Sequence, residues 1–243
     1  MEKIDNLDQL QALVRSHPRA RTNFYLLPNQ CQPLIDIGKL FYINTDDSLF
    51  IFEERDYYYK FYLRFSGSQG NFHHPGTKLV SYTTYRNEPD EIIAEKLNAL
   101  GFRYKLTQIR LCASDLNIET NAVITPATEE EAIELFSEAF DPLYADLPCR
   151  GMFQNLAALR DSSGKPLGIV HYDDTKALLL IAVRPDAKKQ GIATSLVAEF
   201  AKKCSSLPGD YHIWVVDNNE AALNLYRKLG FSPDRLKSDL YIF

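Results

Sequence analysis

The sequence predicts an α/β (α+β) protein in which a mixed, mostly antiparallel sheet is flanked by helices and the chain is built as two similar halves. Three observations predict this fold class. Residues 178–183 form a continuous apolar run that leads through a turn into a helical pattern. Residues 40–63 contain three short runs of aromatic and β-branched residues. A helix that ends in Leu-Gly-Phe before a strand occurs twice, at Gly101 and Gly230.

Composition fits a globular chain and excludes several classes of protein. The 243 residues are 45% hydrophobic and 24% charged, which is enough for one large or two small domains. Because no run of 18 apolar residues and no basic start with an apolar segment occurs, we expect neither a membrane span nor a signal peptide, and a cytoplasmic location. The net charge of −5 provides no basic surface for nucleic acid.

The first half is expected to span residues 1–120. Its predicted elements are a helix at 5–16 capped by Asp5, a loop with Pro18 and Pro28, an antiparallel meander at 40–43, 49–52 and 57–63, a strand at 79–85, a helix near 89–100 and a strand at 104–112. The last three elements and the Leu-Gly-Phe stop resemble the C-terminal end of the chain. We therefore interpret the first half as a degenerate copy of the second without a cofactor site; the alternative is a chance match of a common helix-stop pattern.

Two groups of residues could hold a metal, and neither is expected to do so. Residues 66–76 are rich in Gly and Ser and contain His73 and His74, which favours a surface loop over a metal or phosphate site, because adjacent histidines on a strand point to opposite faces. The four cysteines are widely scattered and form no Cys-x-x-Cys pair. The sequence therefore predicts free thiols without a catalytic or redox role, and no metal site.

The second half is expected to span residues 121–243. Its predicted elements are a strand at 122–125, a helix from the cap Thr128 to Phe140, a loose segment at 141–155, a hairpin at 156–160 and 167–172, the strand at 178–183, a helix from about 190 to 204, a strand at 212–216 and a helix from Asn219 to the stop at Gly230. Glu131 completes a capping box with Thr128.

Residues 178–195 carry the first chemical signal. The buried strand delivers the chain to a helix N-terminus, where unpaired amides and the helix dipole favour anions such as phosphate. Gly191 permits close approach of a phosphate, and Lys188 and Lys189 add positive charge. Neither of two familiar phosphate-loop patterns, G-x-x-x-x-G-K-[ST] and G-x-G-x-x-G, is present.

Residues 219–231 carry the second signal. Asn219 starts a helix, Ala222 and Tyr226 share its apolar stripe, and Gly230 ends it. Together, Lys188-Lys189-Gln190-Gly191-Ile192-Ala193 and the Asn-x-x-Ala-x-x-x-Tyr-x-x-x-Gly-Phe segment resemble the acetyl-CoA motifs of the GNAT N-acetyltransferase family. The first motif departs from the family pattern, since lysines stand where Arg or Gln and a small glycine are common.

The resemblance implies a GNAT fold for the second half, acetyl-CoA as co-substrate, and a set of site residues. Backbone groups of Ile181, Ala182 and Val183 would hold the pantetheine and thioester. The loop formed by Lys188, Lys189, Gln190, Gly191, Ile192, Ala193 and Thr194 would hold the pyrophosphate. Asn219, Ala222 and Tyr226 would contact the cofactor, and Tyr226 would also protonate the leaving thiolate, although a tyrosine on an apolar stripe is also typical of a core.

The general base is not evident. The strand at 178–183 has no carboxylate, so His171, Asp173, Asp174 and Asp217 are candidates, as are a water chain or an amine that binds neutral. We expect an N-acetyltransferase that acts on a primary amine of a small molecule or peptide, without nucleic-acid or membrane partners. The alternative is a non-catalytic acyl-CoA-binding or interaction module. The acceptor and the oligomeric state are left open.

Overall fold

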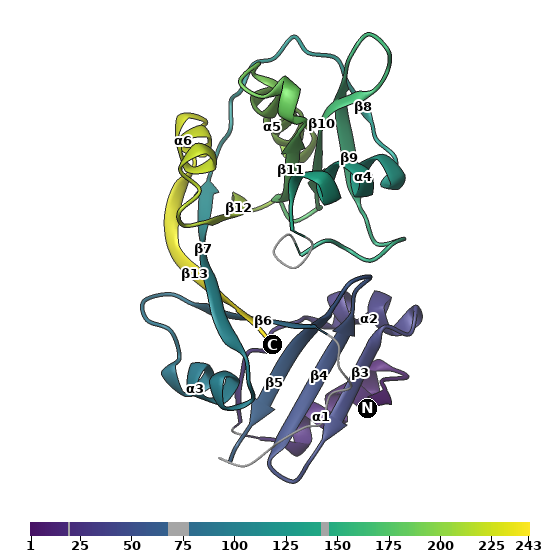
Figure 1. Ribbon diagram of the computed structural model, residues 1–243, viewed down its shortest axis with the longest axis vertical. Helices are drawn as coiled ribbons and strands as arrows, with labels where there is room; N and C mark the ends of the chain where they lie inside the picture. The colour runs from purple at the N-terminus through teal and green to yellow at the C-terminus, as the bar shows by residue number, and fades with distance from the viewer. Residues whose placement is uncertain (19, 68–77, 142–145) are drawn as a thin grey trace. The chain divides into compact units, whose positions relative to one another are not determined.

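The computed structural model describes residues 1–18, 20–67, 78–141 and 146–243. The chain forms two compact units, one of Met1–Thr107 with Lys237–Phe243 and one of Gln108–Leu236 (Figure 1). These units divide the chain at Gln108, twelve positions before the end of the predicted first half, and the first unit also takes the last seven residues. The histidine pair at 73 and 74 lies outside the described residues.

The first unit is a sheet with strand order β1-β3-β4-β5-β6-β13, to which β2 adds by pairing with β5. Its elements are β1 (Glu2–Lys3), α1 (Leu7–Ser16), β2 (Arg21–Thr22), α2 (Pro28–Asp36), β3 (Leu40–Asn44), β4 (Ser48–Glu54), β5 (Tyr59–Phe65), β6 (Leu79–Tyr85), α3 (Glu91–Ala99) and the start of β7 (Arg103–Ala113). The meander of β3, β4 and β5 is antiparallel, as predicted.

Two local predictions for this unit were wrong. Asn6, and not Asp5, caps α1 by accepting a hydrogen bond from the Gln9 amide. The expected loop around Pro28 contains the helix α2, because Pro28 occupies the first helical positions, where no N–H is needed. Pro33 lies inside this short helix and hid it from the helical pattern.

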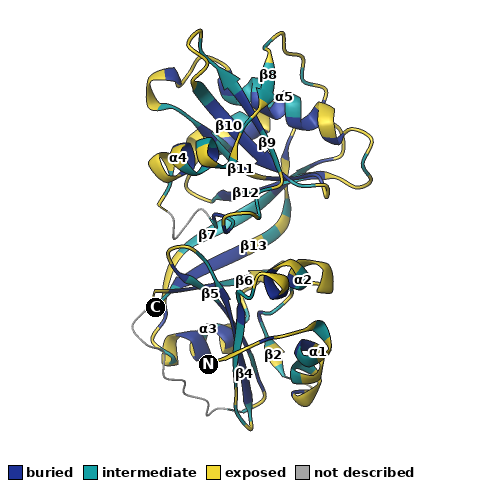
Figure 2. Ribbon diagram, turned by 90° about the vertical axis from the view of Figure 1, so that its right-hand side faces the viewer, coloured by how far each residue is buried: buried dark blue, intermediate teal, exposed yellow. Residues whose placement is uncertain are grey.

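The second unit has the strand order β7-β12-β11-β10-β9-β8. Its elements are β8 (Ile124–Pro126), α4 (Glu129–Ala139), β9 (Asn155–Arg160), β10 (Pro166–Tyr172), β11 (Ala177–Val183), η1 (Pro185–Ala187), α5 (Ile192–Cys204), β12 (Tyr211–Val216), α6 (Glu220–Lys228) and the start of β13 (Ser232–Ile242). The predicted hairpin, motif strand and two motif helices are confirmed. In Figure 2 the strands and the inner sides of α4 and α5 are buried, while the outer sides of these helices are exposed.

The two units repeat the same helix, stop and strand. The helices α3 and α6 begin at Glu91 and Glu220, 129 positions apart, and each has nine residues. After each, a glycine adopts a positive φ, 101° at Gly101 and 100° at Gly230. The next amide, of Phe102 or Phe231, donates a 3.0 Å hydrogen bond back into the helix. Two eleven-residue strands, β7 and β13, then follow, so the resemblance between the halves extends to individual hydrogen bonds.

These repeated strands are exchanged between the units. Residues 108–113 of β7 pair antiparallel with β12 and complete the sheet of the second unit. Residues 237–242 of β13 pair antiparallel with β6 and complete the sheet of the first. The strand that follows α3 thus completes the sheet of the second unit, and the strand that follows α6 completes the sheet of the first. For this reason the two compact units do not coincide with the two similar halves of the sequence.

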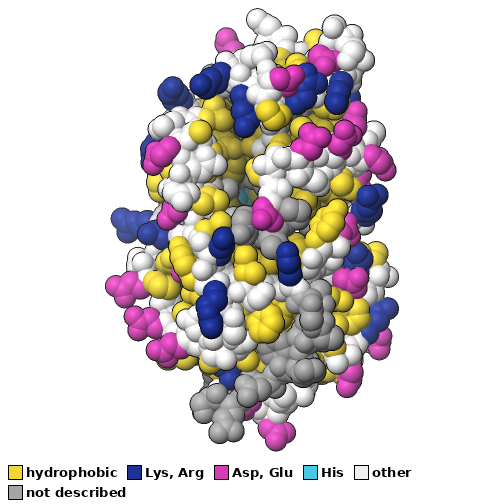
Figure 3. Space-filling view, viewed as in Figure 1, with side chains coloured by type: hydrophobic (Ala, Val, Ile, Leu, Met, Phe, Trp, Pro, Cys, Tyr) yellow, Lys and Arg dark blue, Asp and Glu magenta, His cyan; other side chains and the backbone are white. Residues whose placement is uncertain are grey.

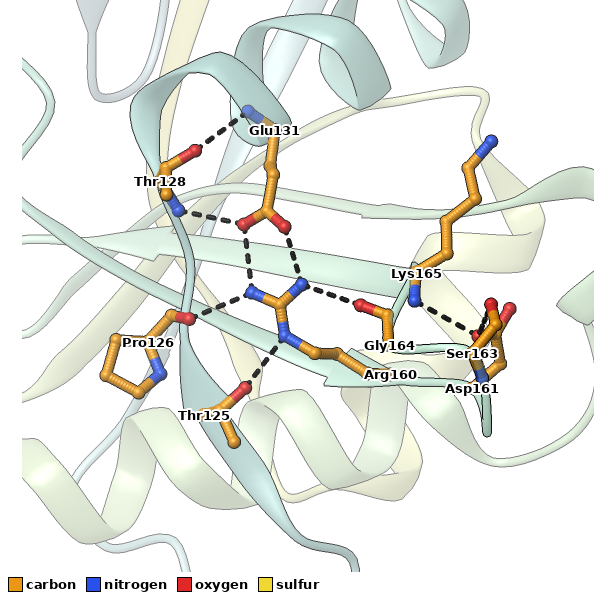
Figure 4. A network of polar contacts seen from close by, with 9 residues as sticks. All are labelled: Thr125, Pro126, Thr128, Glu131, Arg160, Asp161, Ser163, Gly164 and Lys165. Carbon is orange, nitrogen blue, oxygen red and sulfur yellow. Dashed lines mark hydrogen bonds and ion pairs between the residues drawn. The ribbon is translucent and has the colours of Figure 1, made fainter.

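An arginine network joins β8, α4 and β9 in the second unit (Figure 4). The Arg160 guanidinium donates to both carboxylate oxygens of Glu131, at 2.5 and 2.9 Å, and also to the Pro126 and Gly164 carbonyls. Glu131 meanwhile forms the predicted capping box with Thr128. The hydrogen bonds from Arg160 are the largest cause of the low pKa of Glu131, about 2.

Replacing Arg160 by Leu is expected to lower the free energy of unfolding by about 2 kcal/mol, because several charge-assisted hydrogen bonds are lost. The lowered pKa of Glu131 means that its contribution is complete above its ordinary value of 4.5 and is lost as the pH falls toward 2. Urea titrations from pH 7 to pH 3 should therefore show a shallower acid loss in the variant than in the wild type. Equal pH dependence of the two proteins would contradict this role.

Within the ranges that the structure describes, no helix is both long and apolar enough to cross a bilayer, and no three His, Cys, Asp or Glu side chains gather as metal ligands would. All four cysteines are free thiols. Cys31, Cys149 and Cys204 are buried, and Cys112 is half-buried.

Candidate functional site

The centre of the candidate site is the place where β11 and β12 separate. These parallel strands pair only at Ala177 with His212 and at Leu178 with Ile213. In the part of the chain that the structure describes, no hydrogen bond joins the rest of β11 to β12. Figure 3 shows a hollow with hydrophobic walls in the upper half of its face, in the region where Figure 1 draws β11 and α6.

The backbone of β11 faces this opening at alternate residues. The amide of Arg184, just after the strand, donates 2.8 Å to Leu167 on the β10 side. Because backbone groups alternate between the two edges of a strand, those of Ile181 and Val183 point to the opposite side, toward the separation from β12. The backbone of Ala182 points toward β10, so Ile181 and Val183 are better placed than Ala182 to hydrogen-bond an extended ligand.

The N-terminus of α5 lies directly after this strand and has no side-chain cap. By contrast, α1, α3, α4 and α6 are each capped by a side-chain oxygen. The first recorded bond of α5 runs from the Ser195 amide to the Gly191 carbonyl. The amides of Ile192, Ala193 and Thr194 therefore precede the helical ladder and remain available to an anion.

The loop before α5 is bent by two residues with positive φ, Lys189 at 63° and Gly191 at 79°. Its base is fixed by Arg184, which pairs with Asp186 at 2.6 Å, and by the side chain of Gln190, which donates 3.2 Å to the Asp186 carbonyl. The left-handed backbone at Lys189 explains why a glycine suits this position. Lys188 and Lys189 are exposed and place two cations beside the free amides.

The helix α6 brings the second motif to the same apolar cluster. Asn219 caps α6 by accepting 3.2 Å from the Ala222 amide. Tyr226 is 3% exposed and packs edge-on against Phe231, with ring centroids 5.6 Å apart. The cluster that contains Tyr226 also contains Ile192 and, at its margin, Ile181 and Val183. Burial raises the pKa of the Tyr226 phenol, which keeps it protonated and able to donate a proton at neutral pH.

The four candidate bases differ in their surroundings. His171 is 1% exposed, accepts 3.2 Å from the Gln154 amide at Nε2, and has its pKa lowered to about 4 by burial. Asp173 accepts hydrogen bonds from Thr175 and the Ala177 amide in the hairpin turn, and Asp174 accepts one from Asn155. Asp217 is exposed and follows β12 at the end where β11 and β12 separate.

The equivalent opening in the first unit is filled by its own chain. Here β5 and β6 also pair in parallel at only two positions, 59 with 79 and 60 with 80. Beyond these, β2 pairs with β5, and Asn23 bridges the strands: its side chain accepts 2.7 Å from the Leu63 amide and donates 2.8 Å to Ser81 Oγ. Asn23 is 3% exposed. A ligand therefore has no access to the β5 edge of this unit.

The connection between β5 and β6 is also much shorter than the one that carries α5 in the second unit. Only residues 66–78 connect β5 to β6, whereas residues 184–210 connect β11 to β12 and contain α5. The position that corresponds to Tyr226 is Leu97, 129 residues earlier, which is buried in the core. Sequence reasoning gave no sign of Asn23, because nothing in the residues around it indicates a strand.

An open strand edge, an uncapped helix N-terminus and a buried tyrosine therefore border one apolar cluster of the second unit. Residues 122–231 match the model of the acetyltransferase (GNAT) family. This segment is a GNAT acetyltransferase domain.

Solved structures share the fold over most of the chain. They include a GCN5-related N-acetyltransferase from Kribbella flavida, with a TM-score of 0.55 and 13% identity over 87% of this chain and 91% of that one. An acetyltransferase of the GNAT family from Colwellia psychrerythraea has a TM-score of 0.54 and 15% identity, over 100% of this chain and 98% of that one. A tandem GNAT protein from the clavulanic acid biosynthesis pathway has a TM-score of 0.50 and 9% identity, over 81% of this chain and 78% of that one. A search of curated proteins gave no significant match.

Proposed function

We propose that the second unit transfers an acetyl group from acetyl-CoA directly to a primary amine of a small molecule or peptide. The observation that carries the proposal is the open end of the β11–β12 pair next to the uncapped N-terminus of α5, in a domain of the GNAT acetyltransferase family. The filled opening of the first unit supports a single site in each chain.

The residues of the site fit the two ends of acetyl-CoA. Amides from Lys189 to Thr194, with Lys188 beside them, would donate hydrogen bonds to the pyrophosphate oxygens. The backbone of Ile181 and Val183 would hydrogen-bond the pantetheine amides and the thioester carbonyl. Bound in this way, acetyl-CoA supplies an activated acyl carbon, and the side chain of Asn219 lies at the start of α6 to contact its arm.

The reaction needs the protein mainly to position the amine and the thioester and to supply one proton to the leaving sulfur. The amine nitrogen forms a bond to the acyl carbon while the carbon–sulfur bond breaks, and Tyr226 gives its phenolic proton to the departing sulfur. Amides of β11 would stabilise negative charge that develops on the carbonyl oxygen. Among the candidate bases, we favour Asp217, directly or through water, because the other two aspartates hold turn contacts and His171 is buried with its Nε2 already accepting from the Gln154 amide.

A screen of primary amines and short peptides with acetyl-CoA tests the proposed function. Thiol release should rise above the hydrolysis background with at least one class of amine, and mass spectrometry should find the acetylated amine. If acetyl-CoA binds but no amine supports thiol release, the proposal of catalysis fails and the non-catalytic acyl-CoA-binding module remains.

A further inference from the structure

A second hollow of about 640 Å³ lies in the second unit, at the other end of α5 from the phosphate-binding loop. Residues 114–122 form one wall, and the C-terminal half of α5 forms the other with Lys176 and Tyr211. The hydroxyl of Thr120 donates 3.0 Å to Ser195 Oγ, which ties this wall to the helix. None of the predicted cofactor residues lines the hollow, and its volume is in the range of small-molecule sites.

A buried cation faces this hollow. Lys176 is 6% exposed, and its Nζ lies 4.4 Å from the ring centroid of Tyr211. The Tyr211 hydroxyl donates 3.0 Å to the Ala201 carbonyl, which fixes the ring beneath the ammonium. Among the described residues no carboxylate pairs with the Lys176 ammonium and no acceptor hydrogen-bonds it. The ammonium rests on the Tyr211 ring, and an anion bound in the hollow would supply the charge partner that a largely buried lysine favours.

The backbone conformation of Lys176 is unusual for a lysine. Its φ is 61°, in the left-handed region that favours glycine, at the end of the turn between β10 and β11. The turn closes with a hydrogen bond from the Asp173 amide to the Ala177 carbonyl, which any residue at position 176 would allow. A lysine in this conformation carries a conformational cost that glycine would not, and such outliers are concentrated at ligand sites.

The opposite wall supplies negative charge. Asp115 and Glu119 line the hollow from residues 114–122, and both are exposed, without an ion pair to any described residue. On the α5 side, Lys202 adds a second cation, and Glu199 on the same helix pairs with Lys203 at 3.8 Å. A ligand that pairs with the cations on one wall and the carboxylates on the other would carry both a carboxylate and an ammonium group. We propose that this hollow binds a free α-amino acid, with its carboxylate on Lys176 and its ammonium on the Asp115 and Glu119 side.

The test is a thermal-shift screen of the proteinogenic amino acids without acetyl-CoA, followed by calorimetry of the hits. At least one amino acid should stabilise the protein saturably, and its 2-oxo acid and its decarboxylated amine should bind more weakly, since each lacks one of the two charges. In Lys176→Gly the dissociation constant should rise about 10- to 100-fold, the value of one lost charge-assisted hydrogen bond. Glycine suits the φ at this position, which offsets part of the packing lost with the Lys176 side chain, so the variant should stay folded, and its melting temperature is measured beside the binding.

Lys165→Ala is the matched control, because Lys165 is an exposed lysine of the neighbouring turn between β9 and β10 and should bind the amino acid like the wild type. A Gly191→Glu variant should also keep this binding, which separates it from the proposed cofactor site. Absence of any hit, equal binding by the 2-oxo acid or amine, or unchanged binding in Lys176→Gly would overturn the proposal.

Discussion

Tyr226→Phe is expected to lower kcat about 100- to 1,000-fold and to leave acetyl-CoA binding unchanged. The phenylalanine keeps the packing of the ring against Phe231, and only the proton donor is lost. A general acid contributes roughly this much to a rate. The measurement is steady-state thiol release, with the best amine from the screen, beside calorimetry with acetyl-CoA.

Leu225→Ala is the matched control on the same helix, since Leu225 is only partly buried and borders the same cluster. It should lose stability without a comparable loss of kcat. Because burial raises the pKa of Tyr226, the acid should stay protonated through the alkaline range, and the rate should not fall near pH 10 through this group. A Tyr226→Phe enzyme with wild-type kcat would show that the tyrosine is a core residue only.

Deletion of Lys237–Phe243 is expected to unfold the first unit, although these residues end the repeat that contains the GNAT domain. They pair with β6 along its length, and Leu240 and Tyr241 are buried in the first unit. Loss of these two buried side chains and of the hydrogen bonds to β6 should lower the free energy of unfolding by about 5 kcal/mol or more, a large part of the stability of a domain. Limited proteolysis should then cleave the first unit and leave 108–236 as the resistant core.

Removal of Met1–Lys3 provides the comparison, because β1 is a two-residue edge strand with both residues exposed. That truncation should leave the protease pattern unchanged. If the deletion of the last seven residues instead destabilises only the second unit, the exchange of β7 and β13 between the units is incorrect.

The sequence predicted well those elements whose local signals agree with their packing. The apolar run at 178–183, the Thr128 capping box and the two Leu-Gly-Phe stops lie where the structure has them. In each, hydrophobic period, cap and turn chemistry favour the same state. The helix α2 was missed because Pro33 interrupts its pattern, and its buried residues, Cys31, Leu34 and Ile35, are too few to show a helical period.

Long-range features could not be read from the residues. The exchange of β7 and β13 depends on which strand fills which edge, and both strands have the same length and follow the same stop. Asn23 fills the opening of the first unit through contacts 40 and 58 residues away in the chain. The pairing of Lys176 with Tyr211 also joins two turns that are distant in sequence. Such contacts leave no periodic pattern.

Calorimetric titration of the full chain with acetyl-CoA tests the central claim most directly. We predict saturable binding to one site in each chain, because the opening of the first unit is filled by Asn23. Gly191→Glu should abolish this binding, since a carboxylate enters the phosphate position. Gly209→Glu should retain it, because Gly209 has a similar positive φ and equally open surroundings away from the site. No binding by the wild type, two sites, or equal binding by Gly191→Glu would contradict the account.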